Sequence, residues 1–239
     1  MGARADAGEK GTLYGVSVGP GDPENLTLKA VRVLKAADVI AAPSTGRNRQ
    51  TALGIVADYI AGKPVVDCVT PMSKDPAVIA QAHDRIADDL CALLDEGKNV
   101  AFITLGDVGV YSTYYYTHAR VAARGYRTEV VPGVTSFCDA AARLGRPLCL
   151  GAEPLLIVPV STGNAEALLD VPANKVFMKA GRDLGALRDA LAERGELDDA
   201  AAVANSGLPR EQVCEKFADL DVDSGYFSVV LYRAGGSEG

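Results

Sequence analysis

Apolar runs alternate with helix-like segments along the first 131 residues, and this alternation constrains the fold more than any other feature. Five of these runs are rich in β-branched and apolar residues and predict strands, at residues 12–18, 38–42, 65–66, 100–105 and 128–131. The segments between them keep helical spacing, including predicted helices at 51–60 and 111–124 and a long helix that Gly97 ends. Strands that alternate with helices are typical of an α/β domain with a mostly parallel sheet.

The pattern becomes looser after residue 131. Further strands are predicted at residues 155–158, 175–178, 201–204, 212–217 and 226–232, with helices at 135–144 and 184–194. Only a turn separates the last two strands, so we expect them to pair antiparallel in a mixed sheet. We predict an N-terminal α/β domain at 11–131, a C-terminal α/β domain at 132–235 and a disordered tail at 1–10.

The amino-acid composition argues against several classes of function. The chain has 239 residues, 48% of them hydrophobic and 23% charged, which is usual for a globular protein with a sizeable core. A net charge of −7 argues against a general nucleic-acid binder, which needs excess lysine and arginine. No apolar run reaches the roughly 18 residues that a membrane span needs. Five cysteines without a CxxC pair and two distant histidines favour reduced cytosolic thiols and no metal site.

A glycine-rich turn, GPGDP at 19–23, follows the first strand. Such a turn at a helix N-terminus can receive an anion, but this one lacks the GxGxxG spacing and the Walker lysine. A plain strand-to-helix turn uses the same residues, and in it Asp22 suits the N-cap and Pro23 the first helical position. The turn alone leaves both interpretations open.

Two further small-residue turns enclose the central stretch 102–137. In LGDVGVY at 105–111, two glycines would let a ligand approach the backbone, and Asp107 could accept hydrogen bonds from a ribose or an amino group. A loop that only requires positive φ explains the same residues. In PGVTS at 132–136, Thr135 and Ser136 either cap a helix or offer hydroxyl and N–H groups to a carboxylate or adenine.

Tyrosines are concentrated just after the central turn. In a helix from residue 111, three of them, Tyr111, Tyr114 and Tyr115, would share one face, with Tyr116 beside it. Such a face can be a packed core face with hydroxyls at its rim, or an aromatic wall for a large flat ligand.

Together, the runs GVSVGPGDPENLTLKAVRVLKAADVI, ITLGDVGVYST and VVPGVTSFCDAAARLGRPL resemble the tetrapyrrole methylases of cobalamin and sirohaem biosynthesis. The resemblance extends from about residue 11 to 232. Within that family, the LYG opening, the YSTYYY segment and the loop at 72–75 are most similar to the precorrin-2 C(20)-methyltransferases. One departure is that Val108 stands where the family's central turn commonly has proline. Because valine can adopt the φ that proline fixes, we expect the loop to keep its shape and to be more mobile.

The resemblance implies a two-domain fold with its active site in the interdomain cleft, in a cytoplasmic homodimer. It implies S-adenosylmethionine as methyl donor, S-adenosylhomocysteine as product, and methylation of C-20 of precorrin-2 to give precorrin-3A. The donor contacts that it implies are Leu105, Gly106, Asp107, Gly109, Val110, Thr135, Ser136, Met178, Lys179, Ala180, Asn205 and Ser206.

The acceptor site carries less specific predictions. The resemblance places the GPGDP turn, with Pro20 and Gly21, against the acceptor, and Tyr111 is a further candidate contact. Arg47, Arg49 and Lys74 lie in loops predicted at the same sheet end and could pair with the acceptor's carboxylates, although solvated loop charges are an equal explanation. Asp22 is a candidate catalytic base.

Several alternatives remain at this stage. Within the family, the substrate could be cobalt-factor II of the anaerobic pathway, or another ring carbon could be methylated. A relative that modifies RNA or protein is a further alternative, and the acidic balance disfavours RNA. A non-catalytic nucleotide-binding module is the alternative of a different class, and it would bind S-adenosylhomocysteine without methyl turnover.

Overall fold

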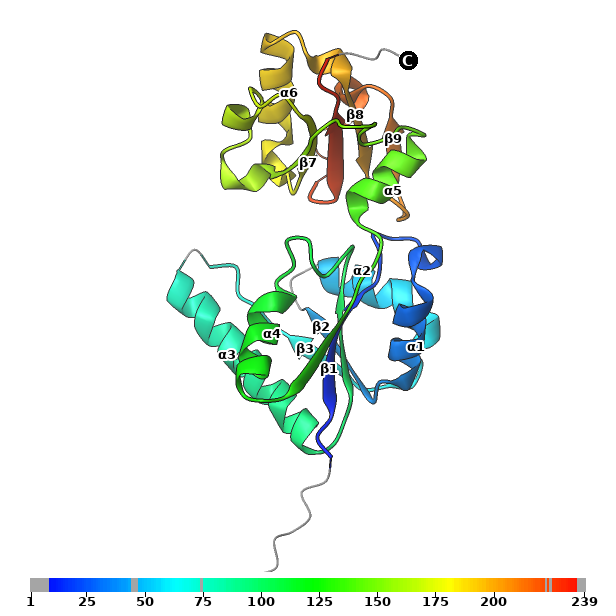
Figure 1. Ribbon diagram of the computed structural model, residues 1–239, viewed down its shortest axis with the longest axis vertical. Helices are drawn as coiled ribbons and strands as arrows, with labels where there is room; N and C mark the ends of the chain where they lie inside the picture. The colour runs from blue at the N-terminus through cyan, green and yellow to red at the C-terminus, as the bar shows by residue number, and fades with distance from the viewer. Residues whose placement is uncertain (1–8, 44–46, 74, 222, 224, 236–239) are drawn as a thin grey trace, which may run out of the picture. The chain divides into compact units, whose positions relative to one another are not determined.

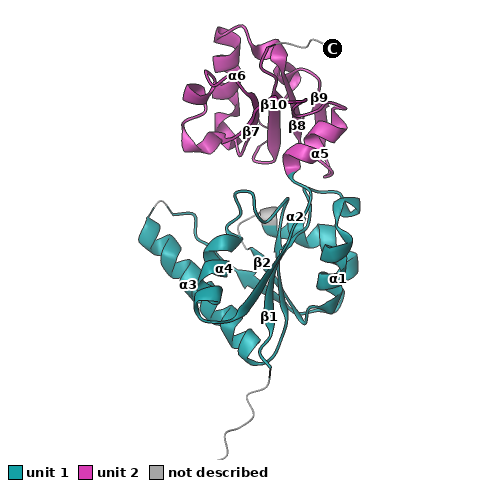
Figure 2. Ribbon diagram, in the orientation of Figure 1, with its two compact units in different colours: residues 1–135 teal, residues 136–239 magenta. Residues whose placement is uncertain are grey.

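The computed structural model describes residues 9–43, 47–73, 75–221, 223 and 225–235 (Figure 1). Most of the predicted tail and the predicted contact Lys74 therefore lie outside the described residues, as does the side chain of Arg47. Lys10, at the end of that tail, places its ammonium 2.8 Å from Asp95. The chain divides into two compact units, residues 1–135 and 136–239 (Figure 2).

The first unit is built on a five-stranded sheet whose neighbours are all parallel. Its strands are β1 (Thr12–Ser17), β2 (Val39–Pro43), β3 (Val65–Cys68), β4 (Val100–Thr104) and β5 (Arg127–Val131), in the order β3-β2-β4-β1-β5. β1, β2 and β4 are buried along nearly their whole length, as strands covered on both faces must be. The predicted parallel sheet is confirmed.

Helices cover both faces of this sheet (Figure 1). The helices are α1 (Leu28–Ala36), α2 (Arg47–Val56), α3 (Pro76–Asp95) and α4 (Tyr114–Ala123), with 3₁₀ turns η1 (Pro23–Asn25) and η2 (Ala57–Tyr59). The first two share a core with one face, and α3 and α4 share a core with the other. β1 and β4 are neighbours, yet the helices that follow them lie on opposite faces. Ligands bind at such a topological switch point in open α/β sheets.

Local signals explain where these helices begin. The Thr27 hydroxyl caps α1 by accepting from the Ala30 N–H at 3.1 Å, and Asp75 caps α3 ahead of Pro76. Two expected boundaries were wrong. The expected polar loop at 44–50 is helical from Arg47, because arginine and glutamine are good helix formers. α4 starts at Tyr114, because Tyr111 has a left-handed φ of 49° that a helix cannot contain.

The second unit has a mixed sheet. Its strands are β6 (Leu155–Pro159), β7 (Asn174–Met178), β8 (Ala200–Ala204), β9 (Gln212–Cys214) and β10 (Ser228–Tyr232), in the order β6-β7-β10-β8-β9. The expected pairing of the last two strands was wrong, because β10 inserts between β7 and β8 and is antiparallel to both. The segment between β9 and β10 holds the 3₁₀ turn η7 (Phe217–Asp219) and is longer than a hairpin turn.

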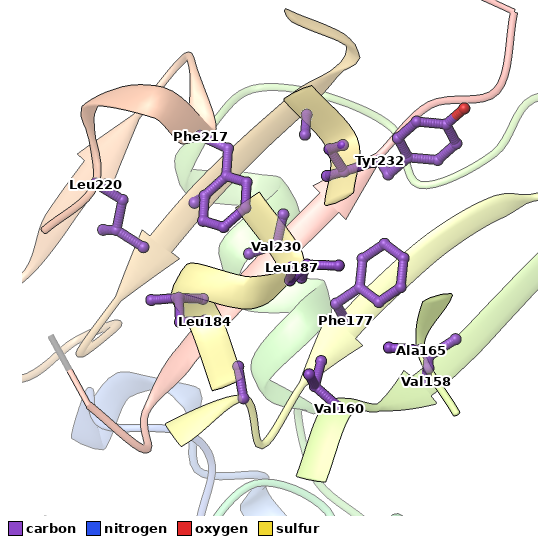
Figure 3. Close-up of a cluster of buried hydrophobic side chains, with 14 of the residues drawn as sticks. Val158, Val160, Ala165, Phe177, Leu184, Leu187, Phe217, Leu220, Val230 and Tyr232 are labelled. Atoms are coloured by element: carbon purple, nitrogen blue, oxygen red, sulfur yellow. The ribbon is translucent and has the colours of Figure 1, made fainter. Parts of the chain in front are cut away.

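The second unit also contains α5 (Ser136–Arg143) and α6 (Leu184–Glu193), with 3₁₀ turns η3 (Val160–Thr162), η4 (Glu166–Leu168), η5 (Gly181–Asp183) and η6 (Leu197–Asp199). Its core gathers Phe177, Phe217, Leu184, Leu187 and Val230 (Figure 3). Each of these side chains is almost fully removed from solvent. The core therefore joins α6 to the inner strands of the second sheet.

One buried histidine makes stability in the first unit depend on pH. His83 of α3 is almost fully buried, and its Nδ1 lies 3.4 Å from the Thr117 hydroxyl of α4. Burial lowers the pKa of His83, the nearby Arg120 charge lowers it further, and Asp84 opposes the change. The unfolded state therefore binds the proton more readily, so stability is lost as pH falls through about 6.5, the unfolded value.

We accordingly expect the urea midpoint to be lower at pH 5.5 than at pH 7.5, a window above the titration of ordinary carboxylates. His83→Gln, which carries no charge at either pH, should reduce that difference. An equal difference in the variant would assign the pH dependence to other groups.

No helix within the described residues combines the length and the apolar character needed to cross a membrane.

Candidate functional site

The site is built from the turns that follow β1, β4 and β5, at the carboxyl edge of the parallel sheet. Just beyond the ends of β1 and β4, Gly19 and Gly106 form an isolated antiparallel bridge. The Gly106 N–H donates to the Gly19 carbonyl at 2.8 Å, and the Gly19 N–H donates back at 3.2 Å. Both glycines have positive φ, 75° and 68°, which explains why glycine is needed at the two places where these turns meet.

The Asp107 carboxylate connects all three turns. One oxygen accepts from the Gly133 N–H after β5 at 2.7 Å and from the Ser17 hydroxyl at the end of β1 at 3.4 Å. The other oxygen accepts from the Gly109 N–H within its own turn at 2.7 Å. Hydrogen bonds from backbone N–H groups to a carboxylate are among the stronger ones in proteins.

Val108 and Ser17 form a second connection between the first two turns. The Val108 N–H donates to the Ser17 Oγ at 2.8 Å, and the valine side chain is fully buried against the α3–α4 face of the sheet. A proline has no N–H and could not make this hydrogen bond. The bond thus offsets the constraint that the absent proline ring would supply. Sequence reasoning missed Ser17, whose only signal was a small polar residue ending an apolar strand before a glycine turn.

The four tyrosines do not act as one surface. Tyr114 is fully buried, its hydroxyl lies 3.2 Å from Nδ1 of His118, and burial raises its pKa. Tyr115 and Tyr116 are about half exposed, and Tyr111 precedes the helix at 45% exposure. The expected shared face was therefore wrong: the core interpretation fits Tyr114, while Tyr111 belongs to the turn after β4.

In the second unit, the predicted contacts lie at the carboxyl ends of β7 and β8 or directly after them. These strands are both antiparallel to β10, so they are parallel to each other and end at the same edge. The residues just after them, Lys179 and Asn205, have left-handed φ values of 56° and 53°. Such conformations are costly for residues other than glycine and cluster at functional sites. Met178 and Ala180, the other predicted contacts of this set, flank Lys179, and Ala180 is buried.

A buried polar network holds the segment after β8. The Ser206 hydroxyl donates to Asp139 of α5, and Arg143 lies 3.2 Å from that carboxylate and 2.9 Å from Glu211. Glu211 in turn accepts from the Gly207 N–H at 2.5 Å. The hydroxyl of Ser206, which is a predicted donor contact, is therefore already hydrogen-bonded within the protein. Asp139 was missed because nothing local in the sequence links it to a residue in the 205–211 loop.

The predicted acceptor contacts are distributed between a turn and a helix. Pro20 and Gly21 are buried in the turn after β1, and the Asp22 carboxylate caps η1 by accepting from the Glu24 N–H at 2.9 Å, as its N-cap prediction required. Arg49 lies in the first turn of α2, not in a loop, and pairs with Asp67 of β3 at 2.5 Å. The positive charge of Arg49 is therefore partly compensated by Asp67.

These features fit a nucleoside-like donor in physical terms. Leu105, Gly106, Gly109 and Val110 lie in a turn that hydrogen bonds within the protein hold at a switch point, and Thr135 and Ser136 follow β5. The described residues contain no group of three or more His, Cys, Asp or Glu side chains that could hold a metal ion. The arrangement can position a ligand closely against backbone.

Comparison with known proteins shows which family the chain is similar to. Residues 12–221 match the family model of the Tetrapyrrole (Corrin/Porphyrin) Methylases. The chain is 34% identical to a cobalt-precorrin-2 C(20)-methyltransferase of Salmonella typhimurium, over 92% of this chain and 95% of that protein. It is 35% identical to a precorrin-2 C(20)-methyltransferase of a Sinorhizobium species, over 92% and 94%.

Solved structures share the fold. A uroporphyrin-III-C-methyltransferase from Thermus thermophilus superposes with a TM-score of 0.66 at 28% identity, covering 93% of this chain and 91% of that one. A cobalt precorrin-4 methyltransferase gives a TM-score of 0.70 at 20% identity, over 92% and 94%, and supports the fold alone. With the family match spanning most of its length, the chain belongs to the tetrapyrrole (corrin/porphyrin) methylases.

Proposed function

We propose that this chain is an S-adenosylmethionine-dependent C-methyltransferase of cobalamin biosynthesis, which methylates C-20 of precorrin-2 to give precorrin-3A. The names of the two relatives aligned over more than nine tenths of the chain support this assignment. The structural observation that carries it is the Asp107-centred junction of three turns at the switch point of the first sheet. Since one relative is named for a cobalt-bearing substrate, cobalt-factor II is the alternative acceptor.

In this proposal each unit supplies donor contacts from the residues at its strand ends. The turn after β4 supplies Leu105 to Val110, with Thr135 and Ser136 after β5. The ends of β7 and β8 supply Met178 to Ala180 and Asn205 with Ser206. The left-handed backbone at Lys179 and Asn205 supports this part, because strained residues at strand ends are typical of ligand sites.

S-adenosylmethionine, when bound, supplies a methyl group on a sulfonium that carries its own leaving group. The protein's task is then to hold donor and acceptor in line and to exclude water. Positioning of this kind is worth up to about 7–11 kcal/mol of a reaction barrier. Leu105, Val108 and Val110 are the apolar residues of the turn after β4, and Val108 is buried. Asp22 is the group that we propose to accept the proton from the methylated carbon.

We also propose that the protein works as a cytoplasmic homodimer on a small-molecule tetrapyrrole. The support for these points is its family membership.

The test is titration of purified protein with S-adenosylhomocysteine, followed by incubation with labelled S-adenosylmethionine and either precorrin-2 or cobalt-factor II. Mass spectrometry and NMR would assign the new methyl to a ring carbon. Label at C-20 of one acceptor is the expected result and identifies the substrate. Binding of S-adenosylhomocysteine without turnover on any tetrapyrrole would instead favour the nucleotide-binding module.

Two arginines in the first turn of α2 give a prediction for binding of the acceptor. Arg47→Ala and Arg49→Ala should each raise KM for the macrocycle, by about tenfold if one charge-assisted hydrogen bond to a carboxylate is lost. Affinity for S-adenosylhomocysteine should not change. Arg127→Ala, at the opposite edge of the same sheet, is the matched control. Equal losses for donor and acceptor would count against an acceptor role.

A further inference from the structure

We propose that Asp107 and Ser17 are positioning residues of the donor site: they hold the turn after β4 in place, and the donor contacts the backbone of that turn and not the Asp107 carboxylate. This inference rests on the proposed function and deepens it. It differs from the sequence-based hypothesis, in which Asp107 accepts hydrogen bonds from a ribose or an amino group.

The first argument is the use that the protein already makes of the carboxylate. Both oxygens accept backbone N–H groups at 2.7 Å, one from Gly109 and one from Gly133. A Cβ on Gly109 would lie 3.0 Å from an Asp107 oxygen, and a Cβ on Gly133 would lie 2.5 Å from the Ser17 Cβ. Backbone therefore approaches this small cluster from two sides, at places where larger residues would not fit.

The second argument is the sharing of one hydroxyl. Ser17 Oγ accepts from the Val108 N–H at 2.8 Å and donates to Asp107 at 3.4 Å. The same serine thus holds the residue after Asp107 through its backbone and Asp107 itself through its side chain. Ser17 ends β1, which pairs with both β4 and β5. The cluster is therefore anchored on the strand that lies between the two strands preceding the other turns.

The consequence concerns Gly106, which precedes Asp107. Gly106 has a φ of 68° and shares two hydrogen bonds with Gly19. With Gly19 bonded on one side and Asp107 on the other, the turn cannot shift without breaking several hydrogen bonds together. These hydrogen bonds fix the conformation of the turn before a ligand binds, and preorganisation of this kind raises affinity by reducing the ordering cost of binding.

The central experiment measures S-adenosylhomocysteine binding by calorimetry for the wild type, Asp107→Asn and Ser17→Ala. Asparagine keeps the shape of aspartate but places an NH₂ group against a backbone N–H. We expect each variant to bind about tenfold more weakly, the effect of one lost charge-assisted or buried hydrogen bond. In turnover, KM for S-adenosylmethionine should rise while kcat changes less. Tyr126→Phe, which removes a hydroxyl bonded to Asp95 at the opposite sheet edge, should leave affinity unchanged.

Donor analogues separate positioning from direct contact. The 2′-deoxy, 3′-deoxy and deaminated analogues of S-adenosylhomocysteine each lack one group that a carboxylate could bind. If Asp107 acts through the backbone, Asp107→Asn weakens all of them by the same factor as the parent compound. A factor that disappears for one analogue would identify a direct contact with the missing group and would overturn the inference.

A double-variant cycle tests the serine independently. The Val108 nitrogen lies 2.8 Å from the Ser17 oxygen, so the Cδ of a proline at 108 would overlap that oxygen. Val108→Pro should therefore weaken binding by itself, and Ser17→Ala should restore part of the loss by opening space. Additive losses would contradict the shared hydroxyl.

The outcomes distinguish this inference from the proposed function. A wild-type protein that does not bind S-adenosylhomocysteine would contradict the function. Wild-type binding that Asp107→Asn and Ser17→Ala leave unchanged would overturn the inference alone. Thermal unfolding of each variant shows whether it is folded, and if Asp107→Asn is not, the smaller change Ser17→Ala decides.

Discussion

Phe177→Ala is expected to lower the free energy of unfolding by about 3–5 kcal/mol, the range for removing a large aromatic side chain from a core. Phe177 lies on β7, next to the central strand β10, and it is fully buried among Val158, Leu187 and Val230 (Figure 3). Alanine would leave a cavity that the surrounding strands and α6 cannot fill. Urea denaturation followed by circular dichroism measures the change.

Val213→Ala is the control for this variant, because Val213 lies on the edge strand β9 and is 43% exposed. Exposed positions of this kind usually change stability by about 0.5 kcal/mol or less. A loss below about 1 kcal/mol for Phe177→Ala would mean that the core repacks around the gap, and that the second unit is less tightly packed than its buried residues indicate.

Gly133→Ala should weaken both stability and donor binding. Its new Cβ would lie 2.5 Å from the Ser17 Cβ, which is too close for a contact between non-bonded carbon atoms. Overpacking of this kind costs about 1–3 kcal/mol. Moving the turn after β5 would also break the Gly133 N–H bond to Asp107, so we expect S-adenosylhomocysteine affinity to fall about tenfold or more.

Gly54→Ala provides the matched control. Gly54 lies within α2, and an added Cβ would meet nothing within 4 Å. Alanine is a better helix former than glycine by about 0.5–1 kcal/mol, so this variant should be equally or more stable and should bind the donor normally. Normal affinity in a folded Gly133→Ala protein would show that the turn after β5 does not contribute to the donor site.

The parallel sheet of the first unit was predictable because its inner strands β1, β2 and β4 are buried on both faces, which produces apolar runs such as 100–105 that differ from the helical segments between them. Strand order was less accessible. β10 follows β9 in sequence, and adjacency in sequence favours a hairpin, yet β10 lies between β7 and β8. That position depends on the tertiary fold, in which β10 shares the core of the second unit with α6, and no local sequence pattern records it.

The turns of the candidate site were predictable from the sequence, whereas the hydrogen bonds that hold them in place were not. Glycines and small polar residues identified the turns at 105–111 and 132–136, because Gly106 has a positive φ and Gly133 lies too close to Ser17 for a side chain. The partners of Asp107 and Ser206 lie far away in sequence, at Ser17, Gly133 and Asp139. Such pairs depend on the tertiary fold, so a local motif does not reveal which protein groups these side chains bind.

The place of β10 in the second sheet has a consequence for protein synthesis. The strand is translated after all its neighbours, yet β7 and β8 pair with each other only through it. A ribosome-bound chain can complete the first unit early, while the second sheet stays in two halves with unpaired inner edges until Ser228–Tyr232 emerges. Nascent chains stalled before Ser228 should therefore expose protease-sensitive sites in the second unit and none of comparable sensitivity in the first.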